Sequence, residues 1–249
     1  VAEVAATLPA GIRLEYEGRY QAMLSHEVKN YALLTYDGQL IVRGVALRSS
    51  RAEPFGVRFL HEALRCTMAG DTIGLRAAYE RIAAAIRTRE LPAAELATRV
   101  RISKPPEAYL AARSAHKEAA YEALLAAGRT TWQPGERVRC YKAQDGGYVW
   151  LPDEREEAIR EEAGDDEAEG FDDILQLDDQ PPLPAAAADD RRDYDVEHYL
   201  QVLVMSYAGR VRKAFAPEDF AQLFRPGLQL GLFDQPIDQI EPHWIRCAE

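Results

Sequence analysis

Residues 152–193 most constrain what this chain can fold into, because their composition cannot supply a core. The segment is dominated by Asp, Glu, Ala and Pro and contains the run QPPLPAAAADD. Such a segment cannot bury enough apolar surface to offset the entropy lost on ordering it. We therefore expect a solvated, mobile insertion, with one helix at residues 153–163, and a fold built from the patterned residues on either side.

The charge of the chain is divided in the same way. The 249 residues carry a net charge of −11, but residues 151–193 alone hold 17 Asp and Glu against 4 Lys and Arg. Residues 1–150 hold 21 Lys and Arg against 16 Asp and Glu. The acidic total therefore does not exclude a nucleic-acid partner, because one short segment supplies more than the whole deficit.

Membrane and secreted proteins are disfavoured. No run approaches the roughly 18 apolar residues of a membrane span, and the first residues lack the basic start and apolar stretch of a signal peptide. Cys66, Cys140 and Cys247 lie far apart and form no CxxC pair, so neither a disulfide framework nor a cysteine zinc site is predicted. These features favour a cytoplasmic protein.

The first fifty residues predict an antiparallel sheet. Apolar and polar residues alternate over Ile12–Glu17, which is typical of a half-buried strand. Two further strand-like runs, residues 31–36 and 39–43, flank Asp37 and Gly38, a pair that favours a two-residue hairpin turn with positive φ at both positions.

From residue 54 the periodicity becomes helical. Apolar faces recur at Val57, Leu60, Leu64 and Met68, then at Leu75, Tyr79, Ile82 and Ile86, and a third helix is predicted around residues 120–125 before Gly128. The paired prolines after Lys104 predict a loop, and residues 137–142 and 148–151 predict a second hairpin. A long amphipathic helix is expected from Val196 to Phe215. The fold class is therefore α+β.

No catalytic or metal-binding motif is complete. The acidic run Asp165–Gly170 resembles a calcium loop but lacks its final glutamate, and residues 70–74 lack the lysine of a phosphate-binding loop. The five histidines show no metal-ligand spacing, and no nucleophile motif occurs. We predict no catalytic residue, metal or cofactor in this chain.

Two blocks carry a resemblance to family B DNA polymerases. Residues 14–17 (LEYE), 28–33 (VKNYAL), 36–38 (YDG) and 43–44 (RG) resemble the palm segment after the catalytic Asp-Thr-Asp turn, which includes a Lys-Lys-x-Tyr motif. Residues 194–199 (YDVEHY) resemble the final thumb helix. Val28 stands where the family has the first lysine of its motif.

The resemblance implies a division of the chain. Residues 1–52 would form the C-terminal part of the palm, a small antiparallel remnant. Residues 53–224 would form a mostly helical thumb with a β-hairpin and the acidic insertion 152–193, and residues 225–249 would form a tail.

It also implies a surface that grips primer–template duplex DNA through its phosphates. The candidate residues are Lys29, Tyr31, Arg43, Arg48, Arg51, Lys104, Arg113, His116 and Lys117. The metal-binding aspartates of such a polymerase would lie upstream of Val1, so Mg²⁺ is expected in the parent polymerase and the chain alone is expected to be inactive. The aromatic residues of the last helix are expected in the core.

The sequence after the thumb-like region contains a second motif. Gln229, Leu230, Leu232 and Phe233 match the bacterial sliding-clamp pentapeptide Gln-Leu-x-Leu-Phe and resemble the peptide of bacterial DNA polymerase II. The apolar side chains would fill a pocket on the clamp while the glutamine amide sets the orientation. The alternative is that they dock the tail onto the rest of the chain.

Our interpretation is the palm end and thumb of a bacterial, DNA polymerase II-like family B polymerase. The first alternative is a non-catalytic DNA- or clamp-binding protein derived from such a thumb. A second alternative is a scaffold bound by protein partners through the acidic insertion.

Overall fold

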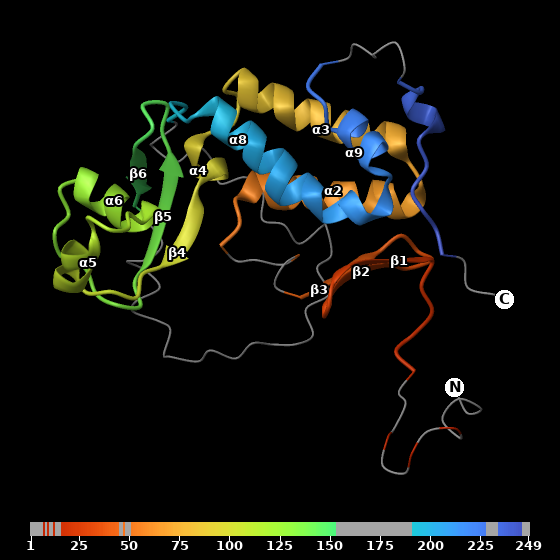
Figure 1. Ribbon diagram of the computed structural model, residues 1–249, viewed down its shortest axis with the longest axis horizontal. Coiled ribbons are helices and arrows are strands. Elements are labelled where there is room, and N and C mark those ends of the chain that lie inside the picture. The colour runs from red at the N-terminus through yellow and green to blue at the C-terminus, as the bar shows by residue number, and fades with distance from the viewer. Residues whose placement is uncertain are drawn as a thin grey trace.

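A computed structural model gives the arrangement of the chain (Figure 1). It describes residues 7, 9, 12, 16–44, 47, 51–152, 191–227 and 234–245. The strands are β1 (Ala22–Glu27), β2 (Asn30–Leu34), β3 (Leu40–Arg43), β4 (Thr98–Arg101), β5 (Arg137–Lys142) and β6 (Tyr148–Leu151). The α-helices are α2 (Pro54–Ala69), α3 (Thr72–Arg87), α4 (Ala93–Leu96), α5 (Pro106–Ala112), α6 (Ala119–Ala126), α8 (Val196–Val202) and α9 (Pro217–Leu223). The other helical segments are η2 (Leu203–Tyr207), η3 (Ala208–Ala214) and η4 (Ile237–Gln239).

The first sheet is antiparallel, in the order β1-β2-β3, as predicted for the hairpin of β2 and β3. The predicted turn is wrong in detail, because Gly38 has a φ of 82° while Asp37 does not adopt positive φ. The loop closes instead between Thr35 and Gln39, where the N–H of Thr35 donates to the Gln39 carbonyl at 3.0 Å. This is the three-residue loop that places one glycine in the left-handed region.

The strand predicted over Ile12–Glu17 is wrong at its described positions, residues 12, 16 and 17, while residues 13–15 lie outside the described residues. Ile12 and Tyr16 are 56% and 61% exposed and neither lies in a strand; the first strand described is β1. In β1 the inward residues Ala22 and Leu24 are buried while Met23 between them is exposed. The same period-two pattern therefore applies, but about ten residues further along the chain.

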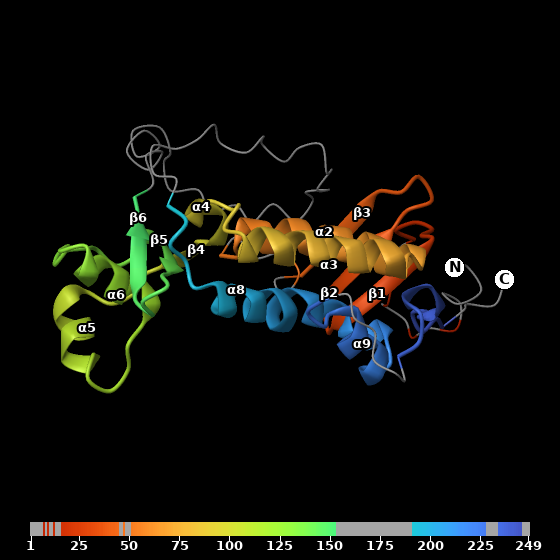
Figure 2. The same ribbon diagram turned by 90° about the horizontal axis from the view of Figure 1, so that it is seen from above.

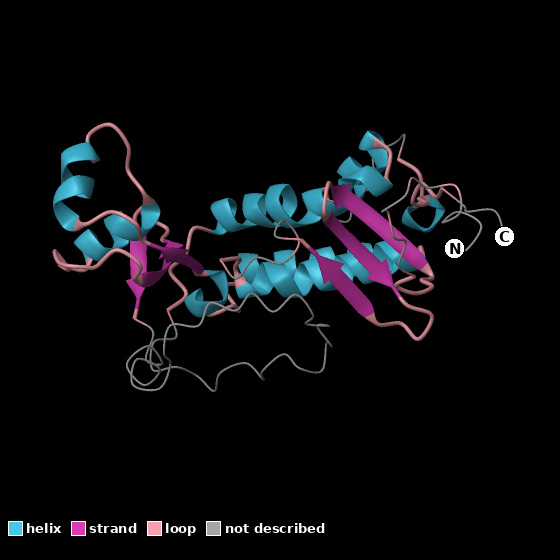
Figure 3. Cartoon of the chain, turned by 90° about the horizontal axis from the view of Figure 1, so that it is seen from below, coloured by secondary structure: helices cyan, strands magenta, loops and turns pink. Residues whose placement is uncertain are grey.

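A layer of helices carries the main core. Helices α2 and α3 lie side by side with the long helix formed by α8, η2 and η3, and the first sheet covers one face of this layer (Figures 1, 2 and 3). The predicted apolar faces are confirmed, since Leu60, Leu64 and Met68 of α2 and Tyr79 and Ile86 of α3 are all buried. These helices therefore form because each has one apolar face that the other elements of the layer cover.

The helix predicted from Val196 is confirmed as one long helical segment, but only its first part is an α-helix. Its first turns are α-helical, η2 is a π-helix and η3 is a 3-10 helix, and Phe215 is already extended with φ −131°. Periodicity alone cannot distinguish these helix types, because all of them bring residues three to five apart onto one side.

A small lobe lies at one end of the helix layer, composed of β4–β6, α5 and α6 (Figure 1). Its sheet is antiparallel in the order β4-β5-β6 and encloses a second core with α5 and α6. The predicted hairpin of β5 and β6 is confirmed, as is the helix before Gly128, which has φ 77°. The predicted loop ends earlier than expected, because Pro106 is the first residue of α5, a position where its missing N–H costs nothing.

The α+β fold class is confirmed. Residues 153–190, which include the predicted helix at 153–163, lie outside the described residues. The last residues of the predicted insertion are described and make contacts: the N–H of Ala93 donates to the Arg191 carbonyl at 2.7 Å, and Tyr141 donates to Asp193 at 2.6 Å. Across the part of the chain that the structure describes, no helix is both long and apolar enough to cross a membrane.

Candidate nucleic-acid interface

The turn between β1 and β2 presents Lys29 to solvent. Lys29 has a φ of 63°, and the Asn30 side-chain amide donates to the Val28 carbonyl at 3.0 Å, which holds the turn closed. Gly44 packs directly under it, since a Cβ at Gly44 would lie 2.3 Å from the Lys29 carbonyl oxygen. The glycine after Arg43 is therefore required for this close approach.

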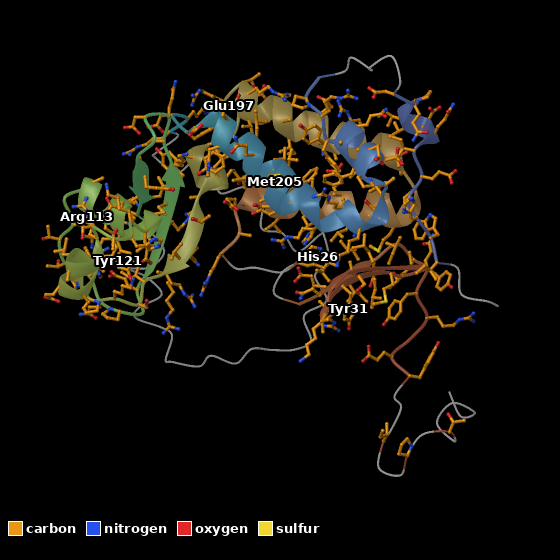
Figure 4. All side chains as sticks on the ribbon, in the orientation of Figure 1. His26, Tyr31, Arg113, Tyr121, Glu197 and Met205 are labelled. Carbon is orange, nitrogen blue, oxygen red and sulfur yellow. The ribbon has the colours of Figure 1, made fainter. Side chains whose placement is uncertain are left out.

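Tyr31 and Arg43 lie beside this turn. They are cross-strand partners in the register of β2 and β3, and both are half-buried. Figure 4 labels Tyr31 on the first sheet. Because directly opposite residues have Cβ atoms about 4.5–5.5 Å apart, their side chains share one face of the sheet. The structure thus brings Lys29, Tyr31 and Arg43 together at one end of the first sheet.

Arg51 is exposed and belongs to a different neighbourhood. The N–H of Arg99 in β4 approaches the Arg51 carbonyl at 3.4 Å, so Arg51 lies beside the second sheet, in the stretch that leads into α2. Arg48 lies outside the described residues.

Two predicted cations of the small lobe are paired with carboxylates. Lys104 contacts Glu118 at 2.5 Å, and Arg113 bonds Glu122 through two N–H···O contacts of 2.7 and 2.9 Å. The Arg113 guanidinium lowers the pKa of Glu122 to about 2, assisted by the Tyr109 hydroxyl. These pairs balance the charges of Lys104 and Arg113 locally.

The loop between α5 and α6 carries the other two predicted residues of the lobe. His116 and Lys117 are exposed there, and the N–H of His116 donates to the Ala112 carbonyl at 3.2 Å. Both side chains are therefore accessible from solvent.

Aromatic side chains position the backbone at Lys104. The Tyr121 hydroxyl accepts the N–H groups of Ser103 and Lys104 at 3.0 and 2.8 Å, and the Trp132 indole donates to the Lys104 carbonyl at 2.9 Å. Tyr109 stacks on Tyr121 with ring centroids 4.2 Å apart. These buried rings, which the sequence analysis did not name as site residues, hold the loop because their polar atoms find their hydrogen-bond partners in its backbone.

One tyrosine hydroxyl joins the lobe to the helix layer, and another joins two helices within that layer. Tyr199 of α8 accepts the N–H of Lys142 at 2.8 Å, and Asp195 donates its N–H to the Lys142 carbonyl at 3.0 Å. Tyr207 accepts the Glu53 N–H at 2.9 Å at the start of α2 and also donates to the Glu53 carboxylate. The predicted core position of the last-helix aromatics is confirmed, and burial raises the pKa of both hydroxyls.

Four arginines of the second sheet were not among the predicted candidates. They occur in two Arg-Val-Arg triplets, residues 99–101 of β4 and 137–139 of β5, which pair in register. Because alternate positions of a strand share a face, the two arginines of each triplet lie on the same face of the sheet.

The described residues offer no site for the Mg²⁺ that the resemblance implies. Within them, no group of three or more His, Cys, Asp or Glu side chains could hold a metal ion.

The clamp-like residues Gln229, Leu230, Leu232 and Phe233 lie outside the described residues. The chain on either side of them is fixed by polar contacts. Arg225 pairs with Asp234, and the Gln222 amide donates to the Gln235 carbonyl. The ends of the segment are therefore held close to each other.

Comparison with known proteins gives one kind of match. No family model and no curated protein matches the sequence. Among solved structures, the family B DNA polymerase from the hyperthermophilic archaeon Pyrobaculum calidifontis is similar, with a TM-score of 0.55 and 13% sequence identity. The match covers 83% of this chain and 23% of that polymerase chain. The fold of this chain is therefore similar to part of a family B DNA polymerase.

Proposed function

We propose that this chain forms the C-terminal end of the palm and the thumb of a DNA-directed DNA polymerase of family B, of the bacterial DNA polymerase II-like type. The observation that carries the proposal is the fold similarity to a family B polymerase across 83% of the chain. The order of the polymerase-like motifs, from VKNYAL at residues 28–33 to YDVEHY at residues 194–199, supports the same assignment.

The proposed role of this region is to grip primer–template duplex DNA without reading its sequence. Lys29 stands exposed on a turn braced by Gly44, with Arg43 and Tyr31 next to it. Cations placed in this way contact phosphates, which are the same at every base pair. A polymerase that copies any template requires this kind of contact, and the Tyr31 ring can pack on a sugar near the primer end.

Fluorescence anisotropy with a labelled primer–template duplex tests the role. We expect the full chain to bind weakly, independently of sequence, with an affinity that falls as salt rises by about 0.9 log units per log unit of salt for each phosphate contact. Lys29→Ala should reduce that slope by about one contact, whereas Tyr31→Phe should leave it unchanged.

The matched control is Arg81→Ala, which removes one positive charge from an exposed position on α3. It should leave the slope unchanged. If the wild-type chain does not bind the duplex at low ionic strength, the proposed gripping role is wrong.

We also propose that Gln229, Leu230, Leu232 and Phe233 bind the bacterial sliding clamp. The observation in favour is that polar contacts hold the chain on either side of the pentapeptide. Arg225 pairs with Asp234, and Arg76 donates to the carbonyls of Arg225 and Gly227. A segment tethered in this way loses less entropy on docking than a free tail would.

Surface plasmon resonance with an immobilised bacterial sliding clamp tests this second role. Leu232→Ala combined with Phe233→Ala should abolish binding, whereas duplex affinity should be unchanged. If the variant unfolds together with losing clamp binding, these residues dock the tail instead. Clamp binding without duplex binding would favour the alternative of a non-catalytic clamp-binding protein.

A further inference from the structure

We infer that the free edge of β1 binds an extended, apolar and acidic peptide segment of a partner protein. The segment would extend the three-stranded first sheet by one strand. The inference goes beyond the proposed function, because it requires neither DNA nor the clamp-like residues. It rests on an unpaired strand edge, on the cleft that encloses this edge, and on the charge of that cleft.

One edge of β1 is unpaired. Among the described residues, β1 has a single strand neighbour, β2. The Leu34 carbonyl of β2 faces β1, because it accepts the Gln21 N–H at 2.7 Å. Ala22 is the register partner of Leu34 and directs its peptide groups to β2, so the next residue, Met23, directs its own to the opposite side. No backbone hydrogen bond within the described part of the chain uses the Met23 N–H or carbonyl on that side.

A cleft of about 870 Å³ encloses this edge from both faces of the sheet. Met23 and Leu33 line it from the outer face, whereas Leu24 and Met68 line it from the side of the helices. Residues 242–245 pass beside the start of β1 and form another wall (Figures 1 and 2). Pockets of about 300–1,000 Å³ hold whole ligands, so the cleft accommodates more than one side chain. A strand added at an edge directs alternate side chains to both faces, and a cleft of this shape therefore fits an extended chain.

The cleft exposes apolar side chains and contains a buried hydroxyl without a partner. The large apolar side chains that line it and are exposed to solvent are Met23, Tyr36, Trp244 and Ile245. Thr67 is 2% exposed, and its Oγ1 has no hydrogen-bond partner in the described residues. Exposed apolar residues gathered at one place mark an interaction site, and a bound chain can supply the partner that the buried hydroxyl lacks.

The charge of the cleft favours an acidic peptide over nucleic acid. Among the described residues that line it, Lys213 is the single Lys, Arg, Asp or Glu. Its ammonium donates to the His26 carbonyl at the end of β1, and no carboxylate of the described residues pairs with it. A nucleic-acid backbone requires a row of cations, whereas one ammonium matches one carboxylate. An antiparallel added strand begins beside the end of β1, so we expect the acidic residue at the N-terminal end of the peptide.

Fluorescence anisotropy with the full chain and a labelled, end-capped peptide tests the inference. The peptide has six residues, the length of β1, with an N-terminal Glu followed by alternating Val and Thr. Two further peptides carry N-methyl groups on one or the other alternate set of amides. We expect the unmodified peptide to bind, and methylation of the set that faces β1 should weaken binding about tenfold or more, because those amides lose their hydrogen bonds. The other set faces away from β1, so the second methylated peptide is the matched control and should retain its affinity.

Substitutions in the chain test the same contacts from the other side. Met23→Pro removes the edge-facing N–H at a position where an edge strand tolerates proline, and should weaken binding of the unmodified peptide about tenfold. Lys213→Gln should weaken it about two- to fivefold and remove the preference for Glu over Gln at the first peptide position. Arg212→Gln removes an exposed cation next to Lys213 but outside the cleft, and should change neither.

The outcomes separate this inference from the proposed function, because no nucleic acid is present. If the unmodified peptide does not bind, or the two methylated peptides bind equally, the edge of β1 is not a site of strand addition. If sedimentation velocity without peptide shows a dimer that Met23→Pro converts to a monomer, a second copy covers the edge and the inference is wrong. A Met23→Pro variant that melts like the wild type and has lost peptide binding supports the inference. If that variant does not fold, the two methylated peptides decide the question on the wild-type chain.

Discussion

Arg76 provides a sharp test of how the C-terminal region is held on the helix layer. Its guanidinium is buried beneath the end of α9, where the last carbonyls of a helix have no partner within the helix. One nitrogen, Nη1, donates to the carbonyl oxygens of Gln222, Leu223 and Arg225 at 3.2, 2.7 and 2.7 Å. The other, Nη2, donates to the Gly227 carbonyl and to the Glu80 carboxylate.

Arg76→Met keeps most of the apolar stem and removes every one of these donors. Each buried acceptor that loses its partner costs about 1–3 kcal/mol, and Glu80 loses the cation that balances it. Water reaches part of this region, since Glu80 is 24% exposed, so the costs do not sum fully. We expect a loss of about 3–5 kcal/mol in the free energy of unfolding, the range for breaking a buried charged pair. For a chain of this size that corresponds to a fall in Tm of about 6–20 °C.

Urea denaturation of the full chain, followed by circular dichroism, measures the loss. Arg81→Met is the matched control, because Arg81 lies on the same helix but is 58% exposed and pairs with Glu62 at the surface. Such a surface pair is worth about 1 kcal/mol or less. If the two variants differ by less than about 1 kcal/mol, Arg76 does not organise the end of α9 as argued.

Three other perturbations have defined outcomes. Glu122→Gln should lower the free energy of unfolding by about 1 kcal/mol above pH 5. The pKa of Glu122 is depressed to about 2 in the folded chain, so its carboxylate stabilises the fold only at a pH where the unfolded carboxylate is also ionised. Melting curves at different pH should therefore show the difference between variant and wild type disappearing as the pH falls from about 4.5 towards 2. Gly56→Ala should lower the free energy of unfolding in urea by about 2–4 kcal/mol, because its Cβ would lie 2.0 Å from the Tyr207 ring. Gly209→Ala, whose Cβ would lie 3.7 Å from its nearest neighbour, should change it little. Equal losses in the two variants would contradict this packing. Residues 155–190 hold 14 Asp and Glu and 2 Lys and Arg. Their replacement by a short Gly/Ser bridge should leave Tm nearly unchanged and should strengthen duplex binding at low salt. A large fall in Tm would show that the segment is packed.

Elements with strong local patterns could be predicted from the sequence. Helices α2 and α3 have wide apolar faces, and β5 and β6 flank a glycine-containing turn, so neighbouring residues alone determine them. Strand β4 has four residues and no such signal; it is a strand because β5 lies beside it. The π-helix η2 ends at Tyr207, whose hydroxyl bonds the start of α2, 154 residues away in sequence, and no local pattern predicts that contact.

In the candidate site, too, contacts between neighbours in sequence could be predicted and contacts between distant residues could not. The proximity of Lys29, Tyr31 and Arg43 follows from strands joined by short turns, whose pairing is local. The carboxylate partners of Lys104 and Arg113 lie 14 and 9 residues away, beyond the reach of any local pattern. Cross-strand charge depends on register, which sequence periodicity does not determine between strands far apart in the chain.

Net charge and local charge act on different length scales in this molecule. At physiological salt the Debye length is about 8 Å, so a duplex bound as proposed would respond mainly to the cations that it touches, such as Lys29. At about 0.01 M salt the screening length is about 30 Å, and the net charge of −11 repels the duplex as a whole. Counterion release weakens binding as salt rises, while screening of this repulsion strengthens it. The two effects oppose each other, so the salt slope of the intact chain underestimates the number of phosphate contacts, and removal of residues 155–190 should steepen it.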